Sequence, residues 1–169
     1  MNKHSGEIVL LGLGSNLGDS RANILAAIEK LNEAGFQVLK ISSFYKTNPV
    51  GNPNQPDFLN IVISGSTLLT PHELLSRCKE IEKSMGRIMN QPRWTARPID
   101  IDIIFYGKRI VQSHELIVPH TQFGERLFVL IPALEVEPDF MLPNGSSLSD
   151  FFERRKSVFN FSDQAIEKI

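Results

Sequence analysis

The chain alternates short apolar runs with segments in which an apolar residue returns every three or four positions. Runs of strand length that are bounded by glycine, proline or polar residues predict β-strands. Such runs cover residues 7–13, 37–45, 58–69, 99–106 and 127–131.

Three other segments have the periodicity and end signals of helices. The first follows a capping residue at position 19 or 20 and ends at Gly35. The second begins with Thr-Pro-His-Glu at residues 70–73, a capping box with proline in its first turn, and ends at Gly86. The third should begin near Ser147, while the tail 156–169 has no clear pattern.

The order strand, helix, two strands, helix, strand predicts a ferredoxin-like α+β sandwich with a mainly antiparallel sheet. We expect residues 1–169 to form one domain, because the chain has neither internal repeats nor an interdomain linker. Two irregular stretches, 47–56 and 87–97, are long for so small a domain. Because loops of this kind are commonly functional, they are candidate catalytic loops.

Composition narrows the classes of function. A net charge of −1 gives no general attraction to nucleic acid or to an anionic membrane. No apolar run approaches the roughly 18 residues that a membrane-spanning helix needs. The single cysteine, Cys78, excludes an internal disulfide framework and suits a reducing compartment. We therefore expect a cytoplasmic protein without nucleic-acid or membrane partners.

The candidate chemistry centres on Asp100 and Asp102 in a predicted strand. Side chains alternate along a strand, so these two carboxylates share one face. Two neighbouring carboxylates repel each other unless a cation lies between them, and Mg²⁺ favours such a pair. The alternative is a polar sheet face whose acids pair with arginines.

The irregular stretch just upstream contains Arg87, Arg93, Trp94 and Arg97 and no acidic residue. Arginine binds phosphate oxygens in a bidentate manner, so this segment is a candidate site for a triphosphate. A solvated surface loop is the alternative. Arginines that lead directly into a carboxylate pair indicate a Mg-nucleotide site.

A second candidate lies where the proline-rich loop enters a strand. Phe58 and Asn60 are two residues apart and share a strand face, which offers a ring for stacking and an amide for reading a heterocycle edge. Phe58 alone is more typical of a core residue. His120 is either a nucleotide contact or a loop histidine, and Glu82 either points toward a site or is a surface carboxylate.

Taken together, the chain resembles the 6-hydroxymethyl-7,8-dihydropterin pyrophosphokinases from about residue 8 to about residue 152. The resemblance rests on motifs in a fixed order. They are Gly-Leu-Gly-Ser-Asn-Leu-Gly at 12–18, Gln-Pro-Asp-Phe-Leu-Asn at 55–60, Gly-Arg at 86–87, Arg-Trp at 93–94, Arg97 with Asp-Ile-Asp-Ile at 100–103, Val-Pro-His at 118–120, and Arg-Leu-Phe-Val-Leu at 126–130.

The resemblance implies a ferredoxin-like fold, a mostly monomeric enzyme, and transfer of pyrophosphate from ATP to the pterin in folate synthesis. It implies that Asp100 and Asp102 hold two Mg²⁺ ions and that Arg87 and Arg97 stabilise the transferring phosphoryl groups. The implied pterin contacts are Thr47, Val50, Phe58, Asn60, Trp94, Asp100 and Phe128. The implied ATP contacts are Glu82, Arg87, Arg97, Ile103, His120 and Arg126.

Some positions depart from the usual pattern of these enzymes, and most lie in segments that would meet the nucleotide. They are Met89, Asn90, Thr95, Ala96, Glu115, Ile117, Thr121 and Gln122. Two other functions remain open from the residues themselves. One is a domain that binds nucleotide or RNA without catalysis, and the other is a metal-dependent glycosyltransferase that uses Asp-x-Asp.

Overall fold

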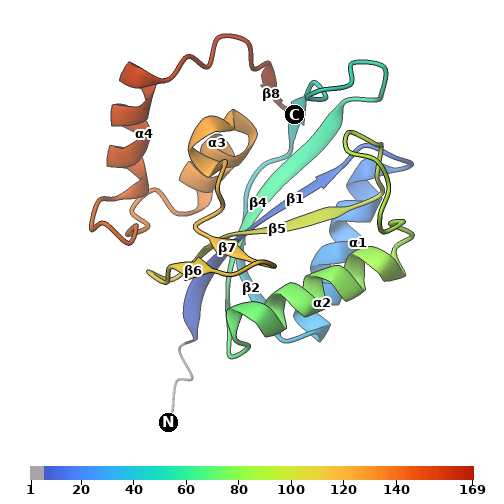
Figure 1. Cartoon of the computed structure of the whole chain (residues 1–169), viewed down its shortest axis with the longest axis horizontal. Helices are drawn as coiled ribbons and strands as arrows, with labels where there is room; N and C mark the ends of the chain where they lie inside the picture. The colour runs from blue at the N-terminus through green and yellow to red at the C-terminus, as the bar shows by residue number, and fades with distance from the viewer. Residues whose placement is uncertain (1–5) are drawn as a thin grey trace.

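A β-sheet lies between two layers of helices, with α1 and α2 on one face and α3 and α4 on the other (Figure 1). The computed structural model describes residues 6–169. The strands are β1 (Glu7–Ser15), β2 (Phe36–Ile41), β3 (Tyr45–Thr47), β4 (Phe58–Thr67), β5 (Asp100–Tyr106), β6 (Val111–Gln112), β7 (Ile117–Val118) and β8 (Ile166–Lys168). The helices are α1 (Ser20–Glu33), α2 (Pro71–Ser84), α3 (Leu127–Val136) and α4 (Leu148–Val158), with a short 3-10 turn, η1 (Phe123–Glu125).

The main sheet has the strand order β5-β1-β4-β3-β8, and β2 pairs with the remaining part of β4. All of these pairings are antiparallel, and β6 and β7 form a separate two-stranded sheet. The predicted α+β sandwich with a mainly antiparallel sheet is therefore confirmed. The tail without a clear pattern contributes the end of α4 and the edge strand β8.

Each face of the sheet carries its own hydrophobic core, because side chains alternate along the strands. On β1, Val9, Leu11 and Leu13 face α1 and α2. Leu10 points the other way and joins the core beneath α3 and α4. Near the end of β1, Gly12 and Gly14 continue the face of Leu10, so this second face has no side chains from β1 there.

The predicted helix starts are confirmed by their caps. Asp19 Oδ1 accepts a hydrogen bond from the backbone N–H of Ala22 (3.0 Å). Thr70 and Glu73 form the reciprocal capping box at the start of α2. Ser147 caps α4 through the N–H of Asp150 (3.1 Å). Among residues 6–169, no helix has both the length and the apolarity required to cross a membrane.

The prediction of a strand at residues 127–131 is wrong, because this segment is the first half of α3. It reads Leu-Phe-Val-Leu-Ile and is apolar at every position, so it carries no periodicity that separates a helix from a strand. Pro132 lies inside the helix and also argued against it. The helix forms because Val129, Leu130 and Ala133 are buried against the sheet.

The predicted strand over residues 37–45 is in fact two strands, β2 and β3, separated at residues 42–44. Ser42 causes the break, since its Oγ accepts the backbone N–H of Val62 on β4 (3.0 Å). Ser43 is held by Glu135 of α3, which accepts its N–H (3.0 Å) and its hydroxyl (2.7 Å). The N–H of Ser42 still donates to the carbonyl of Val62 (3.0 Å), so side-chain bonds replace only part of the backbone ladder at this point.

Candidate active site

The site is built on one row of residues that crosses the sheet. Asp100 of β5 pairs with Gly14 of β1, and Gly14 pairs with Asn60 of β4. Cross-strand partners project from the same face of an antiparallel sheet. Asp100 and Asn60 therefore flank a central position that has no side chain. In the same way, Asp102 lies opposite Gly12.

A side chain at Gly14 or Gly12 would crowd a neighbouring side chain, more closely at Gly14. A Cβ added to Gly14 would lie 2.8 Å from Asn60 Oδ1, and one added to Gly12 would lie 3.3 Å from Ile104 Cδ1. The two glycines thus form an open floor between an acidic strand and an amide. Their spacing of two residues follows from the strand repeat.

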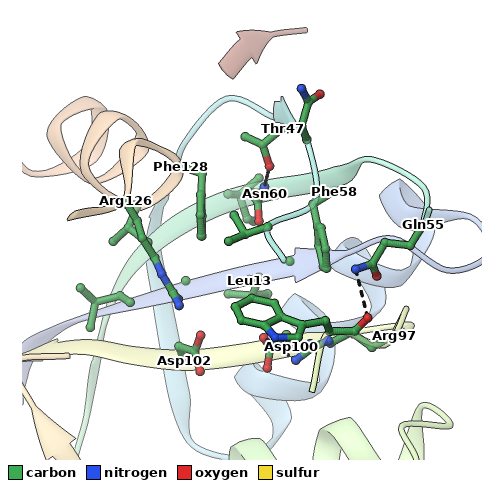
Figure 2. A pocket seen from close by; sticks show the side chains of 18 residues that line it. Leu13, Thr47, Gln55, Phe58, Asn60, Arg97, Asp100, Asp102, Arg126 and Phe128 are labelled. Carbon is green, nitrogen blue, oxygen red and sulfur yellow. Dashed lines mark hydrogen bonds and ion pairs between the residues drawn. The ribbon is translucent and has the colours of Figure 1, made fainter. Parts of the chain in front are cut away.

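Above this floor is a cavity of ≈ 150 Å³. Phe58 at the start of β4 and Phe128 in the first turn of α3 stand on opposite sides of it, with Asn60 between them and the two aspartates below (Figure 2). Seven further predicted residues line it beside Phe58, Asn60 and Phe128, namely Thr47, Val50, Trp94, Arg97, Asp100, Asp102 and Arg126. The structure therefore brings together every predicted pterin contact.

Asn60 is buried, and its amide is held in a fixed orientation. Its Nδ2 donates to Thr47 Oγ1 (2.8 Å). Among residues 6–169, no donor forms a hydrogen bond with Asn60 Oδ1, which faces the cavity floor. No buried side-chain nitrogen or oxygen within residues 6–169 lacks a hydrogen-bond partner, so this oxygen is open to the cavity and available to a ligand N–H.

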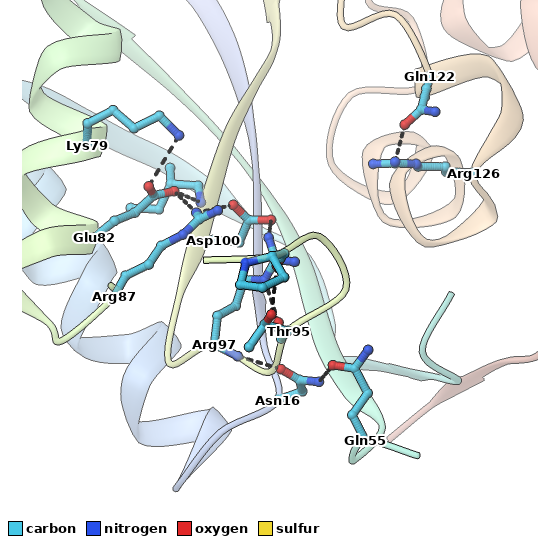
Figure 3. Close-up of polar contacts among 12 residues, drawn as sticks. Asn16, Gln55, Lys79, Glu82, Arg87, Thr95, Arg97, Asp100, Gln122 and Arg126 are labelled. Carbon is cyan, nitrogen blue, oxygen red and sulfur yellow. Dashed lines mark hydrogen bonds and ion pairs between the residues drawn. The ribbon is translucent and has the colours of Figure 1, made fainter. Parts of the chain in front are cut away.

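Asp100 is neutralised by two arginines from the loop that precedes β5 (Figure 3). Arg87 Nη1 lies 2.5 Å from Asp100 Oδ1, and Arg97 Nη1 lies 3.3 Å from Asp100 Oδ2. The alternative that the acids pair with arginines therefore holds for Asp100. Arg87 is half-buried; burial opposes its charge, but the carboxylates of Asp100 and Glu82 outweigh this and raise its pKa.

Asp102 is different, because no hydrogen bond or ion pair to its carboxylate is found in the described part of the chain. Burial, followed by the negative charge of Asp100, raises the pKa of Asp102 to about 7. Its side chain is only partly exposed and lines the cavity. The pair thus contains one compensated and one uncompensated carboxylate.

Glu82 is fully buried, so the interpretation as a surface carboxylate is wrong. Its Oε1 accepts the backbone N–H of Ile101 (2.7 Å) and lies 2.8 Å from Arg87 Nη1, while Oε2 lies 3.2 Å from Lys79 Nζ. Burial raises the pKa of Glu82, and Lys79 opposes that rise. Glu82 thereby fixes the start of β5 and one of the two arginines.

The loop between α2 and β5 lines a second and larger cavity of ≈ 530 Å³. The arginines that line this second cavity are Arg87, Arg93, Arg97 and Arg126, of which Arg126 lies outside the loop, just before α3. Arg97 and Arg126 also line the first cavity, so the two spaces adjoin. This concentration of cations beside the two aspartates suits a polyanionic ligand.

Three predicted nucleotide contacts, Glu82, Ile103 and His120, line neither cavity. The side chain of Ile103 is buried in the core under α1 and α2. His120 Nδ1 accepts the N–H of Gln122 (3.1 Å), and burial, with Arg126 nearby, lowers the pKa of the imidazole.

Comparison with known proteins decides the family. Residues 10–138 match the sequence model of the family described as 7,8-dihydro-6-hydroxymethylpterin-pyrophosphokinase (HPPK). The chain belongs to the HPPK family. The resemblance inferred from the motifs is thus confirmed.

The chain is similar to one relative of about its own length and to another that is much longer. It is 44% identical over 135 residues to the 2-amino-4-hydroxy-6-hydroxymethyldihydropteridine pyrophosphokinase of Aquifex aeolicus. The matched residues make up 80% of this chain and 83% of that protein. It is 45% identical over 130 residues to the folate synthesis bifunctional protein of Arabidopsis thaliana, covering 77% of this chain. The chain spans only 27% of the length of that longer relative.

Solved structures support the fold. The HPPK-DHPS protein of Plasmodium falciparum with pteroate has a TM-score of 0.68, and the match covers 93% of this chain and 44% of that one. At 15% identity, this likeness concerns the fold alone. It agrees with the ferredoxin-like α+β architecture predicted for HPPK members.

Two residues that join the loops of this HPPK site were given no role by sequence reasoning. Asn16 Oδ1 accepts the N–H of Arg97 (2.9 Å), and Asn16 Nδ2 donates to Gln55 Oε1 (3.0 Å). Gln55 Nε2 donates in turn to the carbonyl of Trp94 (3.1 Å). Asn16 directly follows β1 and is buried. The signal in the sequence was an amide residue between two glycines just beyond a predicted strand.

Proposed function

We propose that the chain transfers the pyrophosphoryl group of ATP to 6-hydroxymethyl-7,8-dihydropterin, which yields AMP and the pterin diphosphate for folate synthesis. Membership of a family named for this activity supports the proposal. The observation that carries it for this chain is the row of Asp100, Gly14 and Asn60 below two facing aromatic rings.

The pterin would lie between Phe58 and Phe128, because a flat heterocycle stacks on aromatic faces. Asn60 Oδ1 would accept an N–H from the ring edge, since this atom has no donor within residues 6–169. Thr47 holds that amide in place. Val50, Trp94 and Asp100 would complete the pterin contacts from the wall of the cavity.

Mg²⁺ would be held by Asp100 and Asp102. Within residues 6–169, no cluster of three or more His, Cys, Asp or Glu side chains is arranged to hold a metal ion. Two carboxylates, completed by phosphate oxygens and water, are nevertheless the usual set for Mg²⁺. The uncompensated Asp102 fits such a cation, because positive charge between the acids removes their repulsion. When bound, two ions would neutralise phosphate charge and polarise the reacting oxygens.

In the proposed reaction, the hydroxymethyl oxygen forms a bond to the β-phosphorus of ATP. The bond from that phosphorus to the oxygen shared with the α-phosphate breaks, AMP leaves with this oxygen, and the hydroxyl proton passes to solvent. Such transfers require mainly positioning and charge stabilisation from the protein. Arg87 and Arg97 would provide this by turning from Asp100 toward the phosphates.

The remaining ATP contacts, Glu82, Ile103, His120 and Arg126, stay predictions. Arg126 has the best support, because it lines both cavities and forms no ion pair with a carboxylate of the described residues. Glu82 is better suited to orienting Arg87 than to touching a nucleotide. A monomeric state and a cytoplasmic location also stay predictions.

The direct test is incubation with ATP, Mg²⁺ and 6-hydroxymethyl-7,8-dihydropterin, scored by AMP and pterin diphosphate. We expect both products in equal amounts, and none with Asp102→Asn. Asp139→Asn is the charge-matched control, because Asp139 is exposed and forms no ion pair among residues 6–169. ATP binding without either product would favour the non-catalytic domain, and turnover of a sugar nucleotide would favour the glycosyltransferase.

A further inference from the structure

Helix α3 begins without a cap of its own. The residue at its N-cap position is Arg126, whose side chain forms no capping hydrogen bond and points into the site instead. The first N–H groups of a helix have no partner within it and need an acceptor from elsewhere. Serine, threonine, aspartate or asparagine usually supplies this at the N-cap position. Arg126 leaves that requirement unmet at the turn that carries Phe128.

The acceptor comes from the C-terminal segment. Gln164 Oε1 accepts the backbone N–H of Leu127 (2.8 Å), and Gln164 Nε2 donates to the carbonyl of Glu125 (2.6 Å). One carboxamide therefore joins the peptide groups on either side of Arg126. Gln164 is 37 and 39 residues away from these partners in sequence.

A local turn presents Gln164 to the helix. Its backbone N–H donates to the carbonyl of Phe161 (3.0 Å), and the Phe161 ring packs near Phe152 of α4 with a centroid distance of 6.3 Å. Arg155 of α4 donates to the carbonyl of Gly124 (2.8 Å), so α4 holds the same turn from the other side. The carboxamide is therefore supported on a folded segment.

Beyond Gln164, the same segment supports the opposite wall of the cavity. β8 pairs with β3, and Ile166 lies opposite Thr47 in the ladder. The N–H of Ile169 donates to the carbonyl of Phe44 (3.0 Å). Thr47 is the residue that holds the amide of Asn60. In Figure 1, β8 lies at the end of the segment that follows α4, next to the C-terminus.

We infer that residues 159–169 act as a positioning element of the pterin cavity and that Gln164 is its principal residue. Gln164 fixes the direction of α3 at the turn from which Arg126 and Phe128 project, and β8 fixes the strand that carries Thr47. The family match ends at residue 138, so these contacts belong to a part of the chain outside it. The inference rests on the proposed function for its kinetic consequence.

The test uses the full chain with Gln164→Met, which keeps the length of the side chain but removes both hydrogen bonds. We expect the KM for the hydroxymethyl-pterin to rise about fivefold, comparable with the loss of a helix cap, while kcat stays within about twofold. Gln164→Glu should return KM only part of the way to the wild-type value, because it keeps an acceptor for the Leu127 N–H but loses the donor to the Glu125 carbonyl. Asp163→Ala, an exposed neighbour, is the control.

A merely structural role for Gln164 gives a different result, since a partly unfolded enzyme loses kcat at constant KM. That outcome, or equal KM values for Gln164→Met and the wild type, would overturn the inference.

Hydrogen exchange of the Leu127 amide tests the contact without catalysis, and we expect faster exchange in Gln164→Met. If the wild type releases no AMP, the proposed function fails, whereas the exchange result still decides the contact. Should Gln164→Met not fold, Gln164→Ala replaces it in both measurements.

Discussion

The carboxylate of Glu82 on α2 accepts a hydrogen bond from the backbone N–H of Ile101 (2.7 Å), the residue between the two aspartates of β5. The same oxygen atom lies 2.8 Å from Arg87 Nη1. A single buried group thus links the strand that carries the acids to an arginine that pairs with one of them. The precise placement of Asp100 depends on a helix that lines neither cavity.

Removing the carboxyl group of Glu82 should destabilise the protein. Glu82→Met takes away the acceptor of the buried Ile101 N–H and of Arg87. We expect the free energy of unfolding to fall by about 1–3 kcal/mol in urea titration, because that N–H is left without a partner. Glu80→Met removes an exposed ion pair with Arg77 on the same helix and should change the free energy of unfolding by less than about 0.5 kcal/mol. Equal losses in both variants would contradict a special role for the buried carboxylate.

The raised pKa of Asp102 predicts an unusual dependence of stability on pH in the metal-free protein. Its pKa is about 7 in the folded state, against an ordinary value of 3.8. Between these values the folded state keeps a proton that the unfolded chain has lost. This group therefore stabilises the fold less as pH rises through that window, and its penalty is complete above the folded pKa.

Asp102→Asn removes the titrating carboxylate, so comparing this variant with the wild type separates the contribution of Asp102 to stability from that of other titrating groups. With EDTA present, we expect the variant to gain stability relative to the wild type between about pH 5 and about pH 8. Urea titrations of both proteins at the two pH values measure the difference. A constant difference would show that the carboxylate of Asp102 has an ordinary pKa.

The two facing rings predict selective effects on pterin binding. Phe58→Ala and Phe128→Ala each remove a stacking face worth about 0.5–1.5 kcal/mol beyond its buried area. Calorimetry in the presence of a non-hydrolysable ATP analogue should show weaker pterin binding and little change for the nucleotide. Phe44→Ala, at a ring that lines neither cavity, is the control. Unchanged pterin affinity in both site variants would remove the stacking assignment.

The sequence predicted the parts of the site that lie on regular strands. Alternation alone places Asp100 and Asp102 on one face, and Phe58 and Asn60 on another stretch of that face. It could not predict that Gly14 lies between Asp100 and Asn60, because strand register depends on pairing between distant segments.

The wrong and missing predictions also arise because contacts between distant segments determine the structure at those positions. The apolar run at residues 127–131 forms a helix because of what it packs against, and its own pattern favours neither state. β8 has three residues and exists through its pairing with β3, so no local signal announces it. The burial of Glu82 was also undecidable from helical spacing, because its three partners come from α2, the following loop and β5.

The last prediction concerns Gly51 and Trp94, which meet where the proline-rich loop contacts the arginine-rich loop. Gly51 has φ +86°, and a Cβ placed there would lie 2.4 Å from Trp94 Cδ2 and 2.7 Å from Cε2. The indole therefore rests directly on the glycine backbone. Gly51→Ala should displace Trp94 and expose it further, which shifts its emission to longer wavelength. Because Trp94 is the single tryptophan of the chain, the spectrum reports on this contact alone.

Gly145→Ala separates the steric effect from the cost of a left-handed backbone. Gly145 has φ +85°, and a Cβ there would have no atom within 4 Å. Both variants place alanine where φ is positive, so both should lose a comparable amount of stability, on the order of 1 kcal/mol. Only Gly51→Ala should also shift the emission and, by moving Trp94 from the cavity wall, weaken pterin binding. Identical spectra for the two variants and the wild type would mean that the indole does not rest on Gly51 in solution. The link between the two loops would then depend on the hydrogen bonds of Asn16 and Gln55.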